Sequence, residues 1–556
     1  MRDYSADPAR VSAISRTPIR LRYPGHAPIS VVPARQNDDL SLQPAKGVDS
    51  MVHKGRKVVI IGGGIAGLCA AVYALKCGYD VEVLEMHEMA GGLAMSWPRG
   101  EYRFETCLHW LVGSRAGGEF NALWKELFDI EKLTFVDPEV FVRIETEAGD
   151  MLTMYTDAGR LEEELLRRAP HDATAIRGLT HAIRTLRKFK VIDPSGGFVE
   201  HWVNMLRDVP MFPLLSRLMK MSGRDYGSQF SDPLLRAFFS TGDVGKLSAI
   251  ALVLSLSWMG TGNAGYCIGG AQAMIRLIAE KIAALGGTIR YRARVQRIAV
   301  ENNTAVGVLL ANGEMIRADW VISAADGHAT IFDLLGGGYI DPVMQKMYDE
   351  SETFASYLQV SLGVARDLSG EPPMVTRVLE TPLLVDPQTE MRHLGFRFFH
   401  FDPTFAPKGK TAVTSILPTR NHTYWTELRQ NKPVEYYAEK DRVAAAVIAT
   451  LEKRIPGTSA AVEVVDVSTP ATVIRYTGNW RGSQEGWLVL PGMSMKPLPQ
   501  TLPGLKGFMM VGQWVLPGGG LPSGPMTARP AVKAICRHDH VPFVLLDERL
   551  REPVGV

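Results

Sequence analysis

The clearest pattern of apolar and polar positions lies between residues 58 and 85. A continuous apolar run at 58–61 predicts a buried strand, and apolar residues at helical spacing predict a helix that ends at Gly78. An alternating run at 81–84 then predicts a second strand. Strand, helix and strand in this order form a βαβ unit, whose two strands lie parallel in one sheet.

The turn between the first strand and the helix is rich in glycine. Gly62 allows a tight turn, Gly64 lets the backbone approach a pyrophosphate, and Gly67 lets the helix pack close to the sheet. A pyrophosphate would accept hydrogen bonds from the N–H groups at the positive end of the helix dipole. Glu85 follows the second strand, where a carboxylate accepts hydrogen bonds from a ribose. The unit therefore predicts a site for NAD or FAD.

A second block of regular pattern begins at Gly269-Gly270. It predicts a helix at 271–285, a strand at 288–295, and a pair of strands at 304–310 and 315–321 on either side of the turn dipeptide Asn312-Gly313.

A third block lies near the C-terminus. A strand-like run at 504–513 leads into the glycine–proline loop 514–525, and a helical run follows at 526–536.

The intervening segments have a different character. Residues 157–245 have helical periodicity, whereas 351–476 alternate like strands and include an amphipathic helix at 436–454. Four phenylalanines between 396 and 401 place rings on both faces of one predicted strand. Two interpretations remain open for these rings, a sheet buried against helices and the floor of an apolar substrate site.

Composition excludes several classes of function. The chain has 556 residues, 46% of them hydrophobic and 22% charged, and a net charge of +2 that gives no reason to expect a nucleic-acid partner. Five cysteines without a CxxC pair predict neither a disulfide framework nor a zinc site, so we expect no metal and a reducing, cytoplasmic location. The longest apolar stretch, 247–260, is too short for a membrane span, which needs about 20 residues.

Two segments fall outside this globular pattern. Residues 1–55 are rich in Arg, Pro and Ser and predict a disordered extension, with Met51 as an alternative start. Residues 198–221 combine Trp, Phe and Met with basic side chains. This segment suits peripheral contact with the inner face of a membrane or, equally, a helix pair that covers a substrate cavity. Oligomeric state is left open.

The three glycine-rich blocks, in this order, resemble those of the phytoene desaturases, carotenoid isomerases and retinol saturases, FAD-dependent oxidoreductases of the flavin amine oxidase superfamily. Gly91-Gly92 after Glu85 resembles the longer FAD fingerprint of that group. The resemblance implies an α/β fold, with a Rossmann-like FAD-binding domain of the glutathione-reductase-2 type interleaved with an α+β substrate domain that carries a helical cap. It implies FAD-binding segments at 56–145, 260–345 and 490–540, substrate-binding segments at 146–259 and 346–489, and a tail at 541–556.

The resemblance also implies which residues contact FAD. Two positions depart from the family pattern, because Leu93 stands where many members have Arg or Lys, and Cys107 stands where they have glycine. The expected contacts are Gly62, Gly64, Ile65, Ala66, Gly67, Glu85, Met86, Gly91, Gly92, Leu93, Val295, Gly512, Gly520 and Leu521.

For catalysis we expect His109 first, because it lies a few residues beyond the turn that faces the flavin in the family. A histidine there could protonate an intermediate. A histidine satisfied by the backbone in the core is the alternative. Glu105 is the second, because it takes the place of the acid that ends the short strand before that turn in the family. Lys246 and Arg475 are further side chains that could tune the reaction.

The function that the resemblance implies is desaturation, saturation or cis–trans isomerisation of C–C double bonds in a hydrophobic polyisoprenoid, carotenoid, retinoid or acyl lipid. A flavin amine oxidase is the alternative within the enzymes. A protein that escorts prenylated partners on the same fold without flavin is the alternative outside them.

Overall fold

The computed structural model describes residues 20–21, 29–30, 55–187 and 211–545. The predicted extension 1–55 lies almost entirely outside these residues, as do 198–210 of the predicted membrane-contacting segment and 546–556 of the tail. Within the extension, two short strands, β1 (Arg20–Leu21) and β2 (Ile29–Ser30), pair antiparallel.

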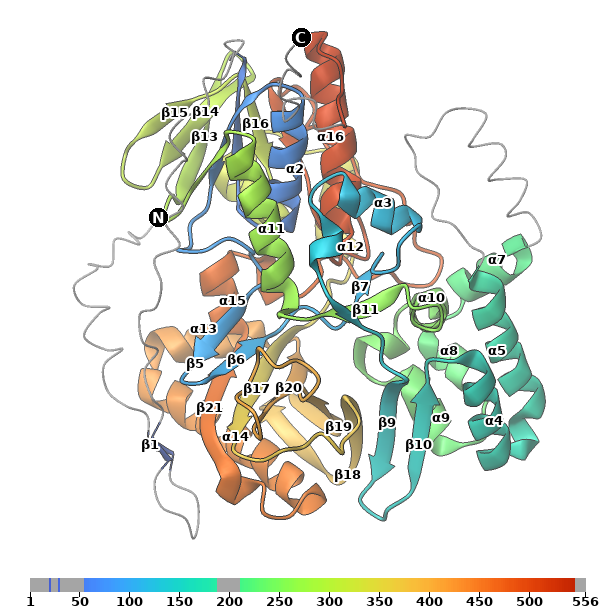
Figure 1. Cartoon of the computed structure of the whole chain (residues 1–556). Helices are drawn as coiled ribbons and strands as arrows, with labels where there is room; N and C mark the ends of the chain where they lie inside the picture. Colours follow the sequence, from blue (N-terminus) through green and yellow to red (C-terminus); the bar gives the residue numbers. More distant parts are fainter. Residues whose placement is uncertain (1–19, 22–28, 31–54, 188–210, 546–556) are drawn as a thin grey trace, which may run out of the picture.

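A parallel sheet forms the centre of the nucleotide-binding half (Figure 1). Its strands come from three distant stretches of chain, and every neighbouring pair is parallel. In spatial order they are β12 (Thr288–Arg290), β4 (Asp80–Leu84), β3 (Lys57–Ile61), β16 (Trp320–Ser323) and β22 (Phe508–Met510).

The two faces of this sheet are covered by different layers. Val58 and Ile60 of β3 face the helices, whereas Val59 and Ile61 face an antiparallel sheet, as expected from the two-residue period of a strand. The helices are α2 (Ile65–Lys76), α11 (Gly270–Ala284) and α16 (Ser523–Asp539). The antiparallel strands are β13 (Val295–Glu301), β14 (Thr304–Leu310) and β15 (Met315–Arg317).

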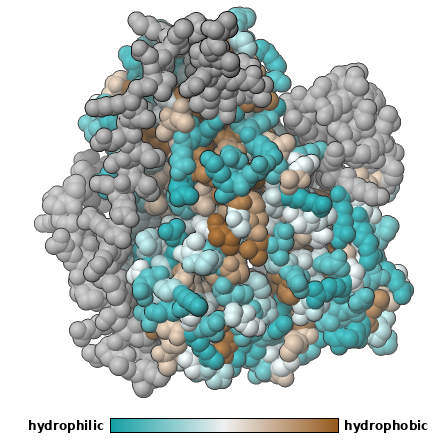
Figure 2. All heavy atoms as spheres, viewed as in Figure 1, coloured by the Kyte–Doolittle hydropathy of each residue, from teal (hydrophilic) through white to brown (hydrophobic). Residues whose placement is uncertain are grey.

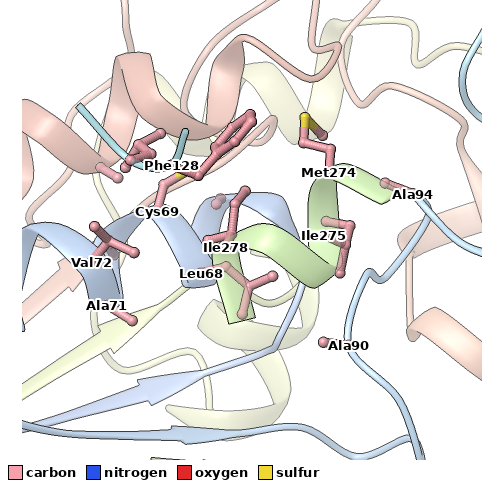
Figure 3. Packing of buried hydrophobic residues seen from close by; sticks show 14 of the residues in the cluster. Leu68, Cys69, Ala71, Val72, Ala90, Ala94, Phe128, Met274, Ile275 and Ile278 are labelled. Atoms are coloured by element: carbon pink, nitrogen blue, oxygen red, sulfur yellow. The ribbon is translucent and has the colours of Figure 1, made fainter. Parts of the chain in front are cut away.

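Close packing of α2 explains the run of small residues in its sequence. Almost the whole helix is buried, and Figure 3 shows Leu68 and its neighbours against Ile275 and Ile278 of α11. Small side chains on α2 allow the two helices and the sheet to approach one another.

A mixed seven-stranded sheet dominates the substrate-binding half. All its neighbouring pairs are antiparallel except β9 with β18. In spatial order its strands are β10 (Met151–Tyr155), β9 (Val140–Thr146), β18 (Met374–Asp386), β19 (Thr389–Phe398), β20 (Thr411–Thr419), β17 (Ser356–Val364) and β21 (Val462–Ser468). The helices α13 (His422–Asn431), α14 (Pro433–Arg454) and α15 (Pro470–Thr477) belong to this half.

A separate group of helices lies beside β9 and β10 and is drawn in teal and green in Figure 1. It contains α4 (Ala158–Arg168), α5 (Ala173–Leu186), α7 (Phe212–Lys220), α8 (Gly223–Gly227), α9 (Pro233–Ser240) and α10 (Ala249–Met259).

Short elements connect these parts. The strands are β5 (Ser96–Arg99), β6 (Tyr102–Glu105), β7 (Leu111–Val112), β8 (Phe135–Val136) and β11 (Ala264–Cys267). The helices are α3 (Glu119–Lys125), α12 (Pro342–Glu350), the π-helix η5 (Ala329–Leu334), and the 3-10 helices η1 (Ile130–Lys132), η2 (Pro170–Asp172), η4 (Gly242–Gly245), η6 (Ser459–Ala461) and η7 (Trp480–Gly482).

The structure corrects one predicted strand. The predicted strand 288–295 contains all of β12 and the first residue of β13, which belong to different sheets, because the chain turns at Arg292 with a positive φ of 54°. The predicted division between 145 and 146 falls inside β9, which pairs with β18 of the seven-stranded sheet.

The aromatic run on β19 is part of the core. Phe396 and Phe398 are fully buried and pack with residues of α14, such as Val443 and Val447. The surface in Figure 2 is mostly hydrophilic, with hydrophobic residues gathered near the middle of the face shown. In the part of the chain that the structure describes, no helix has the length and apolarity to cross a membrane.

Candidate active site

One large cavity, with a volume of about 2040 Å³, connects the two halves of the molecule. Glycine-rich turns of the parallel sheet line one end, which we call the nucleotide end. Apolar side chains of α7, α9, α10 and the seven-stranded sheet line the other end, which we call the apolar arm. Of the site residues predicted from the sequence, all line this cavity except Gly67, Glu105 and Arg475.

The start of α2 presents unpaired backbone donors to the nucleotide end. Its N-cap residue, Gly64, provides no side-chain cap, and within the described residues the N–H groups of Ile65, Ala66 and Gly67 have no hydrogen-bond partner. A helix N-terminus with free N–H groups binds phosphate oxygens. The arrangement fits a diphosphate.

Two glycines of this turn have different roles. A Cβ at Gly64 would meet protein atoms only at 3.9 Å or beyond, so the protein alone does not require glycine there. A Cβ at Gly67 would overlap the carbonyl oxygen of Gly62, so Gly67 is required for the contact between α2 and the turn. Gly67 therefore acts through packing, which explains its absence from the cavity wall.

Glu85 is held by the backbone at the edge of the cavity. Its Oε2 accepts a hydrogen bond from the N–H of Gly63 at 2.7 Å, and its Oε1 accepts one from the N–H of His87 at 2.8 Å. Each carboxylate oxygen has a further lone pair. The fixed carboxylate can therefore accept hydrogen bonds from ribose hydroxyls.

The second glycine pair lies against the first turn. The N–H of Gly91 donates to the carbonyl oxygen of Gly63 at 2.9 Å, and Gly91 forms a bridge with Gly64. Leu93 also lines the cavity, as does the cation Arg294, next to Val295 and Met86 on the same wall. Arg294 is thus a positive charge at the nucleotide end that does not depend on position 93.

The C-terminal block closes the nucleotide end. Gly512 follows β22 with a φ of 103°, and its N–H donates to Thr527 Oγ1 at 2.8 Å. Gly520 and Leu521 precede Pro522, the N-cap residue of α16, and within the described residues their N–H groups have no partner. They resemble the start of α2, and together the two helix starts provide backbone donors at separate points of the same wall.

His109 lies on the cavity wall in a neutral state. Burial, with a smaller effect of Arg397, lowers the pKa of His109 to about 3. The Arg397 Nη2 donates to the carbonyl oxygen of His109 at 2.8 Å. With the pKa lowered in this way the imidazole is neutral at neutral pH, and proton donation by His109 stays a prediction.

Glu105 lies away from the cavity. It ends β6, is 3% exposed, and its Oε2 accepts hydrogen bonds from the N–H of Ala271 at 2.7 Å and from Ser96 Oγ at 3.1 Å. Burial raises its pKa to about 7. The carboxyl group thus caps the start of α11 and ties it to β5, outside the cavity lining, and a catalytic role at this position stays a prediction.

A carboxyl group that the sequence did not single out takes a more favourable position. Glu485 lines the cavity, and within the described residues its side chain makes no hydrogen bond or ion pair. Burial raises its pKa to about 7, and its charge contributes to raising the pKa of the Cys107 thiol, which lines the same wall. Its backbone is pressed against Gly519, where a Cβ would overlap the Glu485 carbonyl oxygen. The glycine loop thus fixes Glu485 beside the site.

The family model of the flavin containing amine oxidoreductases matches residues 65–534. The chain belongs to this family. Prolycopene isomerase of Arabidopsis thaliana is 25% identical over 496 residues, covering 83% of this chain and 80% of its own. The neurosporene-forming phytoene desaturase of Cereibacter sphaeroides is 24% identical, covering 87% and 93%. An oxidoreductase from Methanosarcina mazei shares the fold, with a TM-score of 0.53 at 18% identity over 86% of this chain and all of its own.

Membership of the flavin family confirms the predicted fold class, and it confirms an FAD-dependent oxidoreductase. The two relatives also confirm the resemblance to carotenoid desaturases and isomerases. The unpaired N–H groups at the starts of α2 and α16 and the fixed carboxylate of Glu85 are the groups that such a cofactor requires.

The apolar arm is lined by side chains from several elements of the chain. Its walls include Phe141, Phe238, Leu254, Trp258 and Met374, from strands and helices that lie far apart in sequence. Of the two other predicted side chains, Lys246 lines the arm and its Nζ pairs with Glu352 Oε2 at 2.7 Å. Arg475 instead stacks on Tyr476, 4.1 Å from the ring centre, and does not line the cavity.

Proposed function

We propose that this protein is an FAD-dependent oxidoreductase that desaturates, saturates or isomerises C–C double bonds of a long hydrophobic polyene or acyl lipid. The observation that carries the proposal is the continuity of one cavity, from the helix start that suits a diphosphate to an arm with apolar walls. A volume of about 2040 Å³ exceeds that of ordinary ligand pockets, about 300–1,000 Å³, and leaves room for a long substrate beside a dinucleotide.

We also propose the residues that hold FAD. The N–H groups of Ile65 and Ala66 contact the diphosphate, and Glu85 contacts a ribose. The remaining wall of the nucleotide end comprises Gly62, Gly64, Met86, Gly91, Gly92, Leu93, Val295, Gly512, Gly520 and Leu521.

When bound, FAD supplies hydride acceptance and donation. This chain supplies a dry slot and a group that exchanges protons. The walls of the apolar arm exclude water from the polyene. The ring of His109 is neutral and adds no positive charge to the site. Glu485 is half ionised near pH 7, so its carboxyl group can both give and take a proton at neutral pH.

The experiment is reconstitution with two classes of substrate. The purified holoenzyme is incubated under anaerobic conditions with prolycopene or phytoene in detergent micelles, and separately with aliphatic amines. We expect chromatography to show a polyene with a changed number or geometry of double bonds. Flavin reduction by amines, with no change in any polyene, would overturn the proposal in favour of an amine oxidase.

Peripheral membrane contact forms part of the proposal. Helix α7 has Leu215 and Met219 on the cavity wall, Arg217 and Lys220 in its last turn, and Phe212 48% exposed at its start. Such a helix can lie in a membrane interface and admit a lipid to the arm. Flotation with anionic vesicles tests this contact, and we expect F212S to reduce binding.

A further inference from the structure

Arg397 places a positive charge on the wall of the cavity. It lies on β19, where side chains alternate between the two faces. Phe396 and Phe398 point into the core, whereas His393, Gly395 and Arg397 line the cavity. Gly395 has no side chain, and the end of the Met374 side chain lies 3.2 Å from where its Cβ would stand.

The guanidinium group has few partners. Its Nη2 donates to the carbonyl oxygen of His109 at 2.8 Å, and its Cζ lies 5.1 Å from the ring centres of Tyr266 and Phe399. These contacts fix the group, but among the described residues most of its five N–H donors have no acceptor. A guanidinium group stays protonated even where burial lowers its pKa.

Within the described residues, no carboxylate oxygen lies within 4.0 Å of the Arg397 side-chain nitrogens, although the carboxylate of Glu105 is near enough to counter part of the lowering of the Arg397 pKa. The nearby acids are used elsewhere. Glu105 caps α11, and Asp402 Oδ2 accepts from the N–H of Gly269 at 2.8 Å while its Oδ1 accepts from Thr404. Arg397 is half-buried in the cavity wall, where a charge with only a distant counter-charge is costly, and proteins normally pair such a charge. The missing partner is therefore expected from the contents of the cavity.

We infer that Arg397 binds a carboxylate of the substrate, so that the preferred ligand is a polyene or acyl chain that carries an acid group. This inference rests on the proposed function for the apolar chain, and it adds the polar group. A guanidinium group matches a carboxylate with two parallel hydrogen bonds, which an alcohol or a hydrocarbon cannot form.

Retinoic acid and retinol provide a matched pair of probes, because they share one polyene and differ at the end group. Binding to the holoenzyme is measured at pH 8 by quenching of tryptophan fluorescence. We expect the wild-type protein to bind the acid at least about tenfold more tightly, as charge-assisted hydrogen bonds contribute about 1.5–3 kcal/mol. In R397Q the preference for the acid should disappear, while the affinity for retinol stays unchanged.

R392Q is the control, because Arg392 is a neighbouring arginine of β19 that also lines the cavity but is exposed. It should keep the preference for the acid. R397K keeps the positive charge but loses the two parallel N–H donors of the guanidinium group, so it should retain part of the preference for the acid. The FAD content of each variant verifies that it is folded. Equal binding of acid and alcohol by the wild-type protein would overturn the inference. An acid preference without any double-bond change would instead reject the proposed function and leave the inference standing.

Discussion

The two ends of the cavity are built from different parts of the chain's chemistry. At the nucleotide end, the groups that face the ligand are mainly backbone N–H groups at the starts of α2 and α16, with one carboxylate, Glu85. In the rest of the cavity wall, which we propose as the reacting end, they are side chains, among them His109, Arg397 and Glu485. Binding at the nucleotide end depends on how closely a ligand can approach the backbone. Chemistry at the reacting end depends on which side chains stay charged when they are buried.

This difference affects how each end responds to substitution. A backbone site changes little when surface side chains change, but a single methyl group can block it. A side-chain site can be altered one group at a time without loss of the fold. The following variants separate the two behaviours, in order of decreasing effect on turnover.

The largest effect is expected for Gly67→Ala. Its Cβ would overlap the carbonyl oxygen of Gly62, so α2 must shift away from the turn. We expect a loss of about 3 kcal/mol or more in unfolding free energy, and little FAD in the purified protein. Chemical denaturation and flavin absorbance measure both. Gly178→Ala in α5 is the control, because a Cβ there meets no atom within 4 Å and alanine favours a helix. Wild-type stability in G67A would contradict the packing role.

Glu485→Gln tests the reacting end. An amide cannot exchange a proton, so we expect kcat/KM to fall about 10²-fold while FAD content stays normal. In the wild-type protein, kcat/KM should titrate near pH 7, because burial raises the pKa of Glu485 to that value. It should fall with rising pH if the enzyme adds hydrogen to the substrate, and rise if it removes hydrogen.

The control for this variant is Glu101→Gln, which changes an exposed carboxylate that pairs with Lys410. It should keep both the rate and the pH profile of the wild-type protein. A spectral titration of the bound flavin gives a second readout, since the ionisation near pH 7 should be absent in E485Q. Identical pH profiles for E485Q and the wild-type protein would exclude Glu485 as the proton carrier.

Gly64→Ala tests the backbone site without disturbing the fold. The extended conformation at Gly64, with φ −73° and ψ 176°, is open to alanine, and a Cβ would meet protein only at 3.9 Å. The methyl group would instead occupy the place proposed for the diphosphate. We expect FAD affinity to fall about tenfold or more, with apoprotein stability within about 1 kcal/mol of wild type. Unchanged FAD affinity would show that the diphosphate does not bind at this turn.

The sequence predicts the two ends unequally. The apolar run 58–61, the glycines and Glu85 lie within one βαβ unit, so local pattern is enough to predict the nucleotide end. Arg397 and Glu485 reach the reacting end only because β19 and the loop before Trp487 meet the turn at Cys107 in three dimensions. The pattern of apolar and polar positions along the chain does not predict such a long-range contact.

Two further features depend on contacts between distant segments. A boundary at 145 is compatible with the sequence because β9 looks like any other strand, and only its pairing with β18 links it to the seven-stranded sheet. Glu105 ends β6 as predicted, but the direction of its carboxyl group depends on α11, which begins about 165 residues later.

Glu105→Gln should have the smallest effect on turnover, because Glu105 does not line the cavity. Its effect should appear in stability. Burial raises the pKa of Glu105 from 4.5 to about 7, so the folded state binds the proton more tightly than the unfolded state. That contribution to stability is complete below pH 4.5, is lost as pH rises to 7, and corresponds to about 3 kcal/mol. In E105Q this dependence of stability on pH should vanish. Ser96→Ala, which removes one neighbour of the carboxyl group, should keep it. Melting temperatures from pH 4.5 to 8 measure the slopes. A fall in turnover as large as that of E485Q would place Glu105 at the reacting end after all. The residue that caps α11 would then belong to the side-chain site.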